Sequence, residues 1–282
     1  MGGVQCSLKI RTLYNSFSKT AKKIADYVLE NRDEIIYMSV TELAEKCEVG
    51  ETTIIRFCRK IGLKGYQEFK LVLGREMANK QEIVSDKVTN EDDIETIINK
   101  VTESNIQAIR DTARLISRDT IEKAAEVIIG SDKVDVYGVG SSGFTAGDTK
   151  YKFMRIGIKC ESFSDPHMQC MSAVNLTDKS VAIGISSSGS TKDTVDSLSK
   201  AKEAGAFTIA ITNYAKSPIT NVADLVLLTV ARETPIRSGA LTSKIAQLDV
   251  IDILYTVIAI KSEKKAYEYL NKTAEAVLQK LY

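Results

Sequence analysis

The C-terminal half of the chain alternates short, continuous apolar runs with segments of helix length. The runs are rich in β-branched residues and begin about 20 to 25 residues apart. Such runs are typical of parallel strands that are buried on both faces of a sheet. The pattern predicts an α/β fold with a doubly wound, five-stranded parallel sheet, whose strands are residues 133–137, 158–163, 180–185, 206–212 and 225–230. A long apolar helix at 241–260 and a final helix to Tyr282 follow.

The first part of the chain shows a different pattern, of short amphipathic helices separated by tight breaks. Ser39 and Glu42 carry the signature of a capping box, which predicts a helix that begins at Val40. A break at 48–50 precedes a second helix at 52–61, which a glycine ends. Two short helices joined by a tight turn are typical of an all-α helix-turn-helix domain.

The second helix of this pair has two chemically distinct faces. One face carries apolar residues at the spacing of a core stripe, namely Ile54, Phe57, Cys58 and Ile61. Hydroxyl and basic side chains lie on or near the other face and are the candidate DNA contacts: Thr52, Thr53, Arg56, Arg59, Lys60 and Lys64. Lys70 adds a fifth cation to this segment. A small interaction domain with a solvated basic face would give the same pattern.

The segment between the two patterns predicts one long helix. Residues 90–117 contain neither proline nor glycine, and their apolar positions keep a period of roughly 3.6 residues. The preceding residues 78–91 are the expected hinge. The predicted organisation is a helix-turn-helix domain in 1–80, a helical linker in 81–118 and an α/β domain in 119–282.

Two loops after predicted strands have an unusual composition. Gly-Val-Gly-Ser-Ser-Gly follows the first strand at 138–143, and Ser-Ser-Ser-Gly-Ser-Thr follows the third at 186–191. An ordinary surface loop would include charged residues, asparagine or proline. Because doubly wound sheets bind ligands at the carboxyl ends of their strands, the two loops predict a site for a small polar ligand.

Three classes of ligand fit these loops to different degrees. The first loop, with Glu161 about 20 residues later, matches a dinucleotide fingerprint but leaves the second loop without a role. A Walker-type loop needs Gly-Lys-Ser/Thr, which 189–192 does not supply. A phosphate monoester fits both loops, because N–H groups after Ser190 can donate to its oxygens while Ser141 and Ser142 hold the group that bears it. The hydroxyls that would join them are those of Ser186, Ser188 and Thr191. Without a ligand, these serines would be turn formers and helix caps.

Composition and charge narrow the class of protein. No window of about 20 apolar residues exists, and the N-terminus lacks the pattern of a signal peptide. The 5 scattered cysteines, with 1 histidine in the chain, predict reduced thiols in a cytoplasmic protein and no zinc site. Residues 1–80 hold 14 Lys and Arg against 10 Asp and Glu, so this mildly basic region indicates a polyanionic partner.

The two loops resemble the hallmarks of a SIS (sugar isomerase) domain, Gly-x-Gly-x-Ser and Ser-x-Ser-Gly-x-Thr. Together with residues 54–66 and 236–248, they are similar to the RpiR/MurR family of bacterial transcription regulators over nearly the whole chain. The resemblance implies a DNA-binding domain that is controlled by a phosphosugar from sugar or amino-sugar metabolism. The phosphosugar contacts that it implies are Ser142, Ser186, Ser188 and Thr191, with His167 and Lys244 as additions.

Two positions depart from the pattern of that family. Gly50 stands where a serine or threonine commonly caps the recognition helix, so we expect this helix to start less firmly. Ser190, which we include among the candidate ligand contacts, fills a position often held by glutamate and leaves the loop more neutral. SIS isomerases use a carboxylate to move a proton between sugar carbons, and Glu233 is the candidate for that role.

A DNA-binding regulator is the favoured interpretation, because a helix-turn-helix has no use in an isomerase. It requires neither a catalytic residue nor a cofactor or metal. We expect a homodimer, or a tetramer made of dimers, that binds a near-palindromic operator in double-stranded DNA. The alternatives are an aldose–ketose phosphosugar isomerase with an accessory helical domain and, less favoured, an NAD-sensing regulator.

Overall fold

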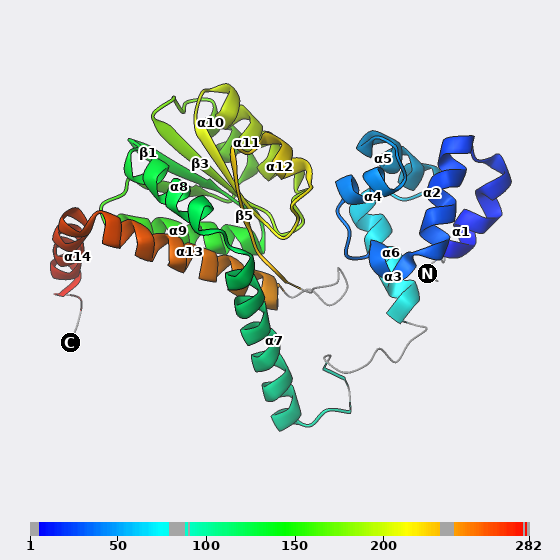
Figure 1. Ribbon diagram of the computed structural model, residues 1–282, viewed down its shortest axis with the longest axis horizontal. Coiled ribbons are helices and arrows are strands. Elements are labelled where there is room, and N and C mark those ends of the chain that lie inside the picture. Colours follow the sequence, from blue (N-terminus) through cyan, green and yellow to red (C-terminus); the bar gives the residue numbers. More distant parts are fainter. Residues whose placement is uncertain (1–5, 79–87, 90, 232–239, 279, 281–282) are drawn as a thin grey trace. The chain divides into compact units, whose positions relative to one another are not determined.

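The structure is a computed structural model that describes residues 6–78, 88–89, 91–231, 240–278 and 280. The chain divides into two compact units (Figure 1). One unit is built from the described residues up to Ser104 together with Ala240 and Leu241, and the other from Asn105–Ala231 and the described residues from Thr242 onward.

The described residues of the N-terminal unit form short helices around one apolar core. These are α1 (Cys6–Leu13), a 3-10 helix η1 (Tyr14–Ser16), α2 (Lys19–Glu30), α3 (Arg32–Ile35), α4 (Val40–Lys46), α5 (Glu51–Lys60) and α6 (Tyr66–Ala78). The core contains the stripes that the sequence predicts on the helix-turn-helix pair, with Ile24, Leu43, Ile54, Phe57, Cys58, Ile61 and Phe69 all buried.

The predicted capping box at the start of α4 is confirmed. The Ser39 N–H donates to the Glu42 carboxylate at 2.6 Å, and the Glu42 N–H donates to the Ser39 hydroxyl at 3.1 Å. These bonds satisfy N–H groups that have no partner within the helix. The turn to α5 has its left-handed residue at Glu48, with φ of +51°, rather than at the glycine two positions later.

Helix α5 begins without a side-chain cap at Gly50, as the departure from the family pattern predicts. The Thr41 hydroxyl compensates by donating to the Glu51 carboxylate at 2.5 Å, which ties the first residue of α5 to α4. The helix ends at Lys60, one residue before the predicted end, and Gly62 adopts a φ of +83° there. Only glycine takes this conformation without steric cost.

The predicted long helix is present as α7 (Ile94–Leu115), shorter at both ends than the 90–117 segment. Its C-terminal half is joined to the sheet unit, because the Thr112 hydroxyl accepts the Val230 N–H at 2.9 Å. The next helix, α8 (Arg118–Ile129), leads into the first strand.

The larger unit contains a parallel sheet in the order β2-β1-β3-β4-β5. Its strands are β1 (Lys133–Tyr137), β2 (Cys160–Phe163), β3 (Ser180–Ile185), β4 (Phe207–Thr212) and β5 (Leu225–Leu228). All five predicted strands are present. The 158–163 prediction begins two residues too early, and the 225–230 prediction ends two residues too late.

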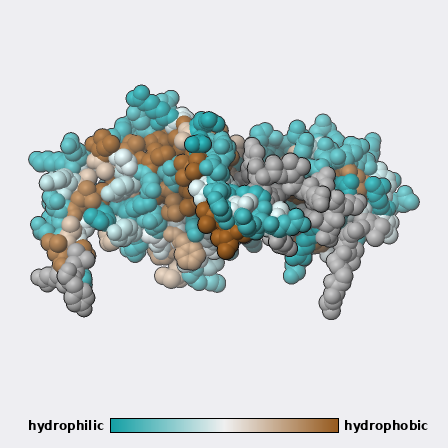
Figure 2. All heavy atoms as spheres, turned by 90° about the horizontal axis from the view of Figure 1, so that it is seen from below, coloured by the Kyte–Doolittle hydropathy of each residue, from teal (hydrophilic) through white to brown (hydrophobic). Residues whose placement is uncertain are grey.

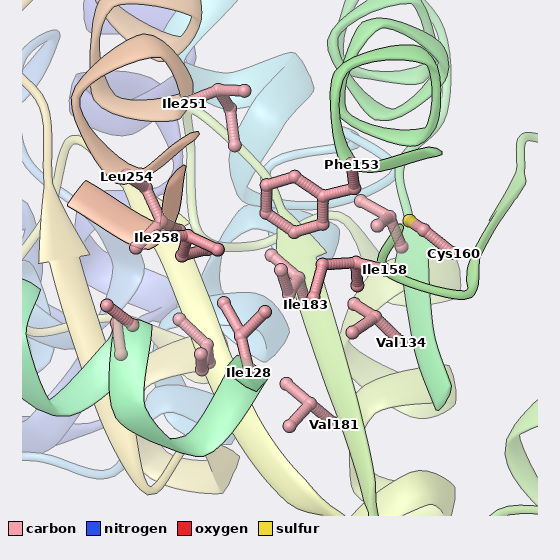
Figure 3. Packing of buried hydrophobic residues seen from close by; sticks show 14 of the residues in the cluster. Ile128, Val134, Phe153, Ile158, Cys160, Val181, Ile183, Ile251, Leu254 and Ile258 are labelled. Atoms are coloured by element: carbon pink, nitrogen blue, oxygen red, sulfur yellow. The ribbon is translucent and has the colours of Figure 1, made fainter. Parts of the chain in front are cut away.

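Helices cover both faces of this sheet, as a doubly wound fold requires (Figure 1). One face is covered by α8, α9 (Ser141–Arg155) and α13 (Leu241–Lys261), and the other by α10 (Pro166–Ala173), α11 (Lys192–Glu203) and α12 (Pro218–Val222). In Figure 3, the Phe153 ring of α9 points toward Ile258 of α13 and Ile183 of β3. A final helix, α14 (Glu263–Leu278), packs Ala266 against this core.

Candidate functional site

The two hydroxyl-rich loops follow neighbouring strands of the sheet. β1 and β3 are paired in parallel, and Tyr137 at the end of β1 is in register with Gly184 near the end of β3. β2 lies on the other side of β1, so the chain reverses its winding direction between β1 and β3. This is the topological switch point, where doubly wound sheets bind their ligands.

The loop after β1 is shaped by a glycine that contacts the next helix. A Cβ at Gly138 would lie 2.6 Å from the Ser142 carbonyl oxygen, so no other residue allows α9 to begin so close to the strand end. Ser141 and Ser142 form the first turn of α9, and both are half-buried. The predicted contacts of this loop are therefore at the switch point.

The loop after β3 is a tight turn held by its own polar groups. The Ser186 and Thr191 hydroxyls lie 2.9 Å apart. The Ser190 N–H donates to the Ser188 hydroxyl at 3.2 Å, and the Gly189 N–H donates to the Ser186 carbonyl at 3.0 Å. The four hydroxyl residues predicted from this loop are thus gathered in one turn immediately before α11.

The start of α11 has the properties of an anion-binding site. Thr191 occupies the cap position, but no side-chain bond caps the helix, and the Thr191 hydroxyl lies against Ser186. The first N–H groups of a helix have no partner within it and lie at the positive end of its dipole. They can therefore bind an anion such as a phosphate group.

The remaining predicted ligand residues differ in their placement. Lys244 is half-buried on α13, one helical turn before the buried Gln247. His167 is exposed near the start of α10, which follows β2, and within the described ranges no hydrogen bond joins it to the two loops. Glu233 lies outside the described residues. In place of His167, the buried Gln169 of α10 reaches the site by donating to the Gly138 carbonyl at 3.1 Å.

The acidic residue of the dinucleotide fingerprint is badly placed for that role. Glu161 lies within β2 opposite Asp135, two residues before the strand ends. Its carboxylate is in an ion pair with Lys150 at 2.6 Å. A dinucleotide ribose needs this carboxylate at the carboxyl end of the strand, so the geometry favours the phosphate monoester.

Gln247 is a site residue that the sequence does not single out. Although it belongs to the family-like segment 236–248, its contacts are evident only in the structure. Its amide bonds to the hydroxyls of Ser142 in the first loop, Ser187 in the second loop and Thr145 on α9. The sequence feature that could have identified Gln247 is its position as a polar residue within the apolar stripe of α13.

The candidate DNA contacts lie on the solvent face of α5. Thr52, Arg56 and Arg59 are exposed, and Thr53 is half-buried. Among the residues that the structure describes, neither arginine has an ion pair or a hydrogen bond, so both guanidinium groups are available to phosphates or base edges.

The two predicted lysine contacts are less free than the arginines. Lys60 is exposed, but its ammonium group donates to the Ser16 carbonyl at 2.9 Å and lies 5.3 Å from the centre of the Phe17 ring. Lys64 is exposed just beyond α5, and its backbone N–H donates to the Glu68 carboxylate. A DNA phosphate would compete with the Ser16 carbonyl for Lys60.

The inclusion of Lys70 among the cations of the basic face is wrong. Lys70 is only 5% exposed, and its ammonium group donates to the Met38 carbonyl at 2.8 Å. It occupies the same helical stripe as Tyr66, Phe69 and Leu73, all of which are buried. Burial lowers the pKa of Lys70 from 10.5 to about 8, because an ammonium ion loses its hydration there.

We predict that Lys70→Met changes how stability depends on pH. Between pH 8 and 10.5 the folded protein has released this proton while the unfolded chain still holds it, so the contribution of Lys70 to stability rises with pH. The free energy of unfolding of the parent, minus that of the variant, should rise by about 3 kcal/mol between pH 7 and 11. Urea unfolding of both proteins at each pH measures this difference.

The free energy of unfolding of the variant is subtracted because the buried thiols lower the stability of both proteins as the pH rises. Burial raises the pKa values of Cys6 and Cys58 from 9.0 to about 12, so unfolding releases their protons above pH 9 and stability falls there. Both proteins share these cysteines, and their effect cancels. A difference that stays flat from pH 7 to 11 would contradict the burial of the Lys70 ammonium group.

Comparisons with known proteins agree with this geometry. The rpiR-family helix-turn-helix domain matches residues 4–80, and the SIS domain matches residues 127–257. An uncharacterised HTH-type transcriptional regulator of Caldanaerobacter subterraneus is 43% identical over 95% of each chain. This chain belongs to the RpiR family of transcriptional regulators. The HTH-type transcriptional regulator HexR of Escherichia coli is 31% identical to it over 95% of this chain and 93% of its own.

A solved structure of similar fold extends the comparison to nearly the whole chain. The Vibrio vulnificus NanR protein, complexed with ManNAc-6P, is 27% identical and superposes with a TM-score of 0.87 over 98% of this chain and 100% of its own. Within the described ranges, no helix has the length and apolarity that a membrane crossing needs. No cluster of three potential metal ligands occurs among those residues either.

Proposed function

We propose that this RpiR-family regulator binds its operator through α5 and that a sugar phosphate, bound where β1 and β3 end, controls this binding. The observation that carries the proposal is the pairing of two hydroxyl-rich loops across the switch point, beside the uncapped start of α11. The phosphate would accept from the first-turn N–H groups of α11 and from Ser188, Ser190 and Thr191. Ser141 and Ser142 would face the sugar.

The comparison with NanR supports one class of sugar. That protein is complexed with ManNAc-6P, so we propose an amino-sugar phosphate as the first effector to test. The loop after β3 carries no charged side chain between Ser186 and Thr191, and the positive end of the α11 dipole would offset part of the phosphate charge. Lys244 and His167 remain candidates for contacts with the sugar, and Glu233 remains a candidate outside the described residues.

The protein would act as a homo-oligomer in the bacterial cytoplasm, where its DNA lies. Figure 2 shows hydrophobic residues gathered on the surface of the larger unit. Exposed apolar side chains include Phe144, Tyr151 and Met154 of α9, and Leu241 and Ile260 of α13. Covering such a surface with a second copy would remove it from water. A two-fold pair of α5 helices would then bind a near-palindrome with half-sites roughly 34 Å apart, or a multiple of this.

Control by the sugar phosphate requires different affinities for two arrangements of the dimer. The effector shifts the population toward the arrangement that it binds more tightly, and DNA does the same in return. No catalytic step is part of this proposal. Turnover of a hexose or pentose phosphate, abolished by Glu233→Gln, would instead favour the isomerase.

A ligand screen with a loop variant tests the proposal. Thermal unfolding would be followed with ManNAc-6P, glucosamine 6-phosphate, glucose 6-phosphate, their free sugars and NAD. A ligand at about 100 times its dissociation constant stabilises the folded state by roughly 2.7 kcal/mol. We expect stabilisation by a sugar phosphate and none by its free sugar. Stabilisation by NAD alone would contradict the proposal.

Ser188→Ala should weaken binding of that sugar phosphate by roughly 10- to 100-fold, because a hydrogen bond to a charged group is lost. DNA affinity in the absence of the sugar phosphate should not change, since the loop is not part of α5. Ser199→Ala is the matched control, because Ser199 lies on the helix that follows this loop but its hydroxyl bonds to Glu203. Isothermal titration calorimetry measures both variants, and equal losses would refute a local role of Ser188.

A further inference from the structure

Gln247 joins the start of α9 to the loop after β3 through one buried amide. The residue is 1% exposed on α13. Its Nε2 donates to the Ser187 hydroxyl at 2.7 Å and to the Ser142 hydroxyl at 3.3 Å, and its Oε1 accepts from the Thr145 hydroxyl at 3.0 Å. Thr145 is fully buried as well. The bonds therefore connect the start of α9, which follows β1, and the loop after β3 to one side chain.

The direction of these bonds determines what the two serines can do. A serine hydroxyl has one proton to donate and two lone pairs that accept. Because Ser142 and Ser187 accept from the amide of Gln247, each keeps its own proton for another acceptor. The Thr145 hydroxyl donates to the Gln247 Oε1 atom, and this bond keeps the Nε2 atom directed toward the two serines. Each loop thus offers one hydroxyl donor whose oxygen is held in place.

The neighbouring pair of hydroxyls in the same loop has no such support. Ser186 and Thr191 bond to each other at 2.9 Å, so one of their two protons is already used. Ser187 is not among the contacts that the sequence suggests, yet its bond to Gln247 is the shortest of the three. The two hydroxyls held by Gln247 therefore each keep a proton for a ligand oxygen, as does Ser188, whose hydroxyl accepts from the Ser190 N–H.

We propose that Gln247 is a positioning residue that holds Ser142 and Ser187 as hydrogen-bond donors to the oxygen atoms of the sugar phosphate. The inference rests on the proposed function, since it needs a ligand at the switch point. Gln247 itself contacts the serines and not the ligand. Preorganised donors strengthen binding because the ligand does not have to order them.

A double-mutant cycle tests whether Gln247 acts through Ser187. Full-length parent, Gln247→Leu, Ser187→Ala and the double variant would be titrated with ManNAc-6P, glucosamine 6-phosphate and glucose 6-phosphate by calorimetry, well below their unfolding temperatures. We expect each single variant to weaken binding about 10-fold. The affinity of the double variant should lie within about threefold of that of the single variant that binds less tightly, because both changes remove the same donor. Losses that multiply to about 100-fold would overturn the proposal.

Gln247→Glu tests whether the Ser142 and Ser187 hydroxyls must be free to donate to the ligand. A carboxylate accepts only, so it would take up the protons of Ser142 and Ser187 while filling the same space. We expect Glu at this position to weaken sugar phosphate binding more than Leu does, by at least about 100-fold. Leu removes all three bonds without adding a charge, so its loss measures the missing support of the donors, and the additional loss with Glu combines the reversed bonds with repulsion between its carboxylate and the phosphate. Thr256→Ala, on an exposed position of the same helix, is the control and should bind as the parent does.

The outcomes distinguish the two proposals. If the parent binds none of the three sugar phosphates, the proposed function fails and the role of Gln247 fails with it. If the parent binds one of them and Gln247→Leu binds it equally well, the proposed function stands and the role of Gln247 is refuted. Because Gln247→Met stays neutral and is close to glutamine in length, it provides a folded comparison if Gln247→Leu unfolds, and it should weaken binding as Leu does.

Discussion

Replacing Arg56 and Arg59 together by alanine should lower operator affinity by at least about 30-fold and leave sugar phosphate affinity unchanged. Both arginines are on the exposed face of α5, opposite the buried Ile54 and Phe57. A specific contact from such a side chain contributes about 1–3 kcal/mol, so two contacts account for losses between roughly 30-fold and 10⁴-fold. Folding stability should change little, because neither side chain has a partner among the described residues.

The measurement is fluorescence anisotropy on a DNA duplex that the parent protein selects from a random pool. Binding would be followed over a series of salt concentrations. Each phosphate contact that is lost lowers the salt slope by about one unit, whereas a lost base contact lowers affinity without that change. The same experiment therefore sorts the two arginines into contacts that position the helix and contacts that read the sequence.

The matched control removes two arginines from other helices of the same unit. Arg11 of α1 and Arg75 of α6 are both exposed, and their replacement changes the net charge by the same amount. We expect the Arg11→Ala, Arg75→Ala variant to bind DNA within about threefold of the parent once long-range charge effects are screened by salt. If both double variants lose equal affinity, the basic character of the unit, and not the face of α5, explains DNA binding.

Local sequence pattern was sufficient for the elements that position the two sites. Continuous β-branched runs located all five strands, because a parallel strand covered on both faces has few polar side chains to interrupt it. The capping box located the start of α4, because Ser39 and Glu42 satisfy each other's N–H groups over three residues. In both cases the interaction that determines the structure is contained in a short segment.

Lys70 and Gln247 could not be interpreted by residue type, because long-range packing determines their roles. The partner of Lys70 is the Met38 carbonyl, 32 residues away, and the serine partners of Gln247 are 60 and 105 residues away. Both nevertheless lie within an apolar helical stripe. Tyr66, Phe69 and Leu73 flank Lys70, and a polar residue in such a stripe is the sign that its polar group has a buried partner.

Replacing Gly189 by alanine should destabilise the larger unit by about 2–4 kcal/mol and abolish the response to the sugar phosphate. Gly189 has a φ of +62°, which costs other residues about 1–3 kcal/mol. A Cβ there would also lie 2.1 Å from the Ser217 hydroxyl oxygen and 2.5 Å from the Ser217 Cβ. Ser217 is fully buried at the start of α12, so it cannot turn aside into solvent.

The loop has little freedom to relax around the added methyl group. The Gly189 carbonyl accepts the Ile219 N–H at 2.9 Å, and the Gly189 N–H donates to the Ser186 carbonyl at 3.0 Å. Moving Gly189 therefore breaks a bond to α12 or opens the turn that gathers Ser186, Ser188 and Thr191. Either change displaces the hydroxyls and first-turn N–H groups that we expect to hold the phosphate.

Gly147→Ala provides the comparison within the same unit. Gly147 lies within α9, and beyond the backbone of its own helix no described atom lies within 4 Å of the position that an added Cβ would take. Alanine should therefore stabilise the helix there by about 0.5–1 kcal/mol. Urea unfolding and calorimetry with the sugar phosphate measure both variants. Opposite signs of the change in stability, with ligand binding lost only in Gly189→Ala, would tie the tight turn after β3 to binding. Equal stability of the two variants would show that the turn adopts a different conformation in solution.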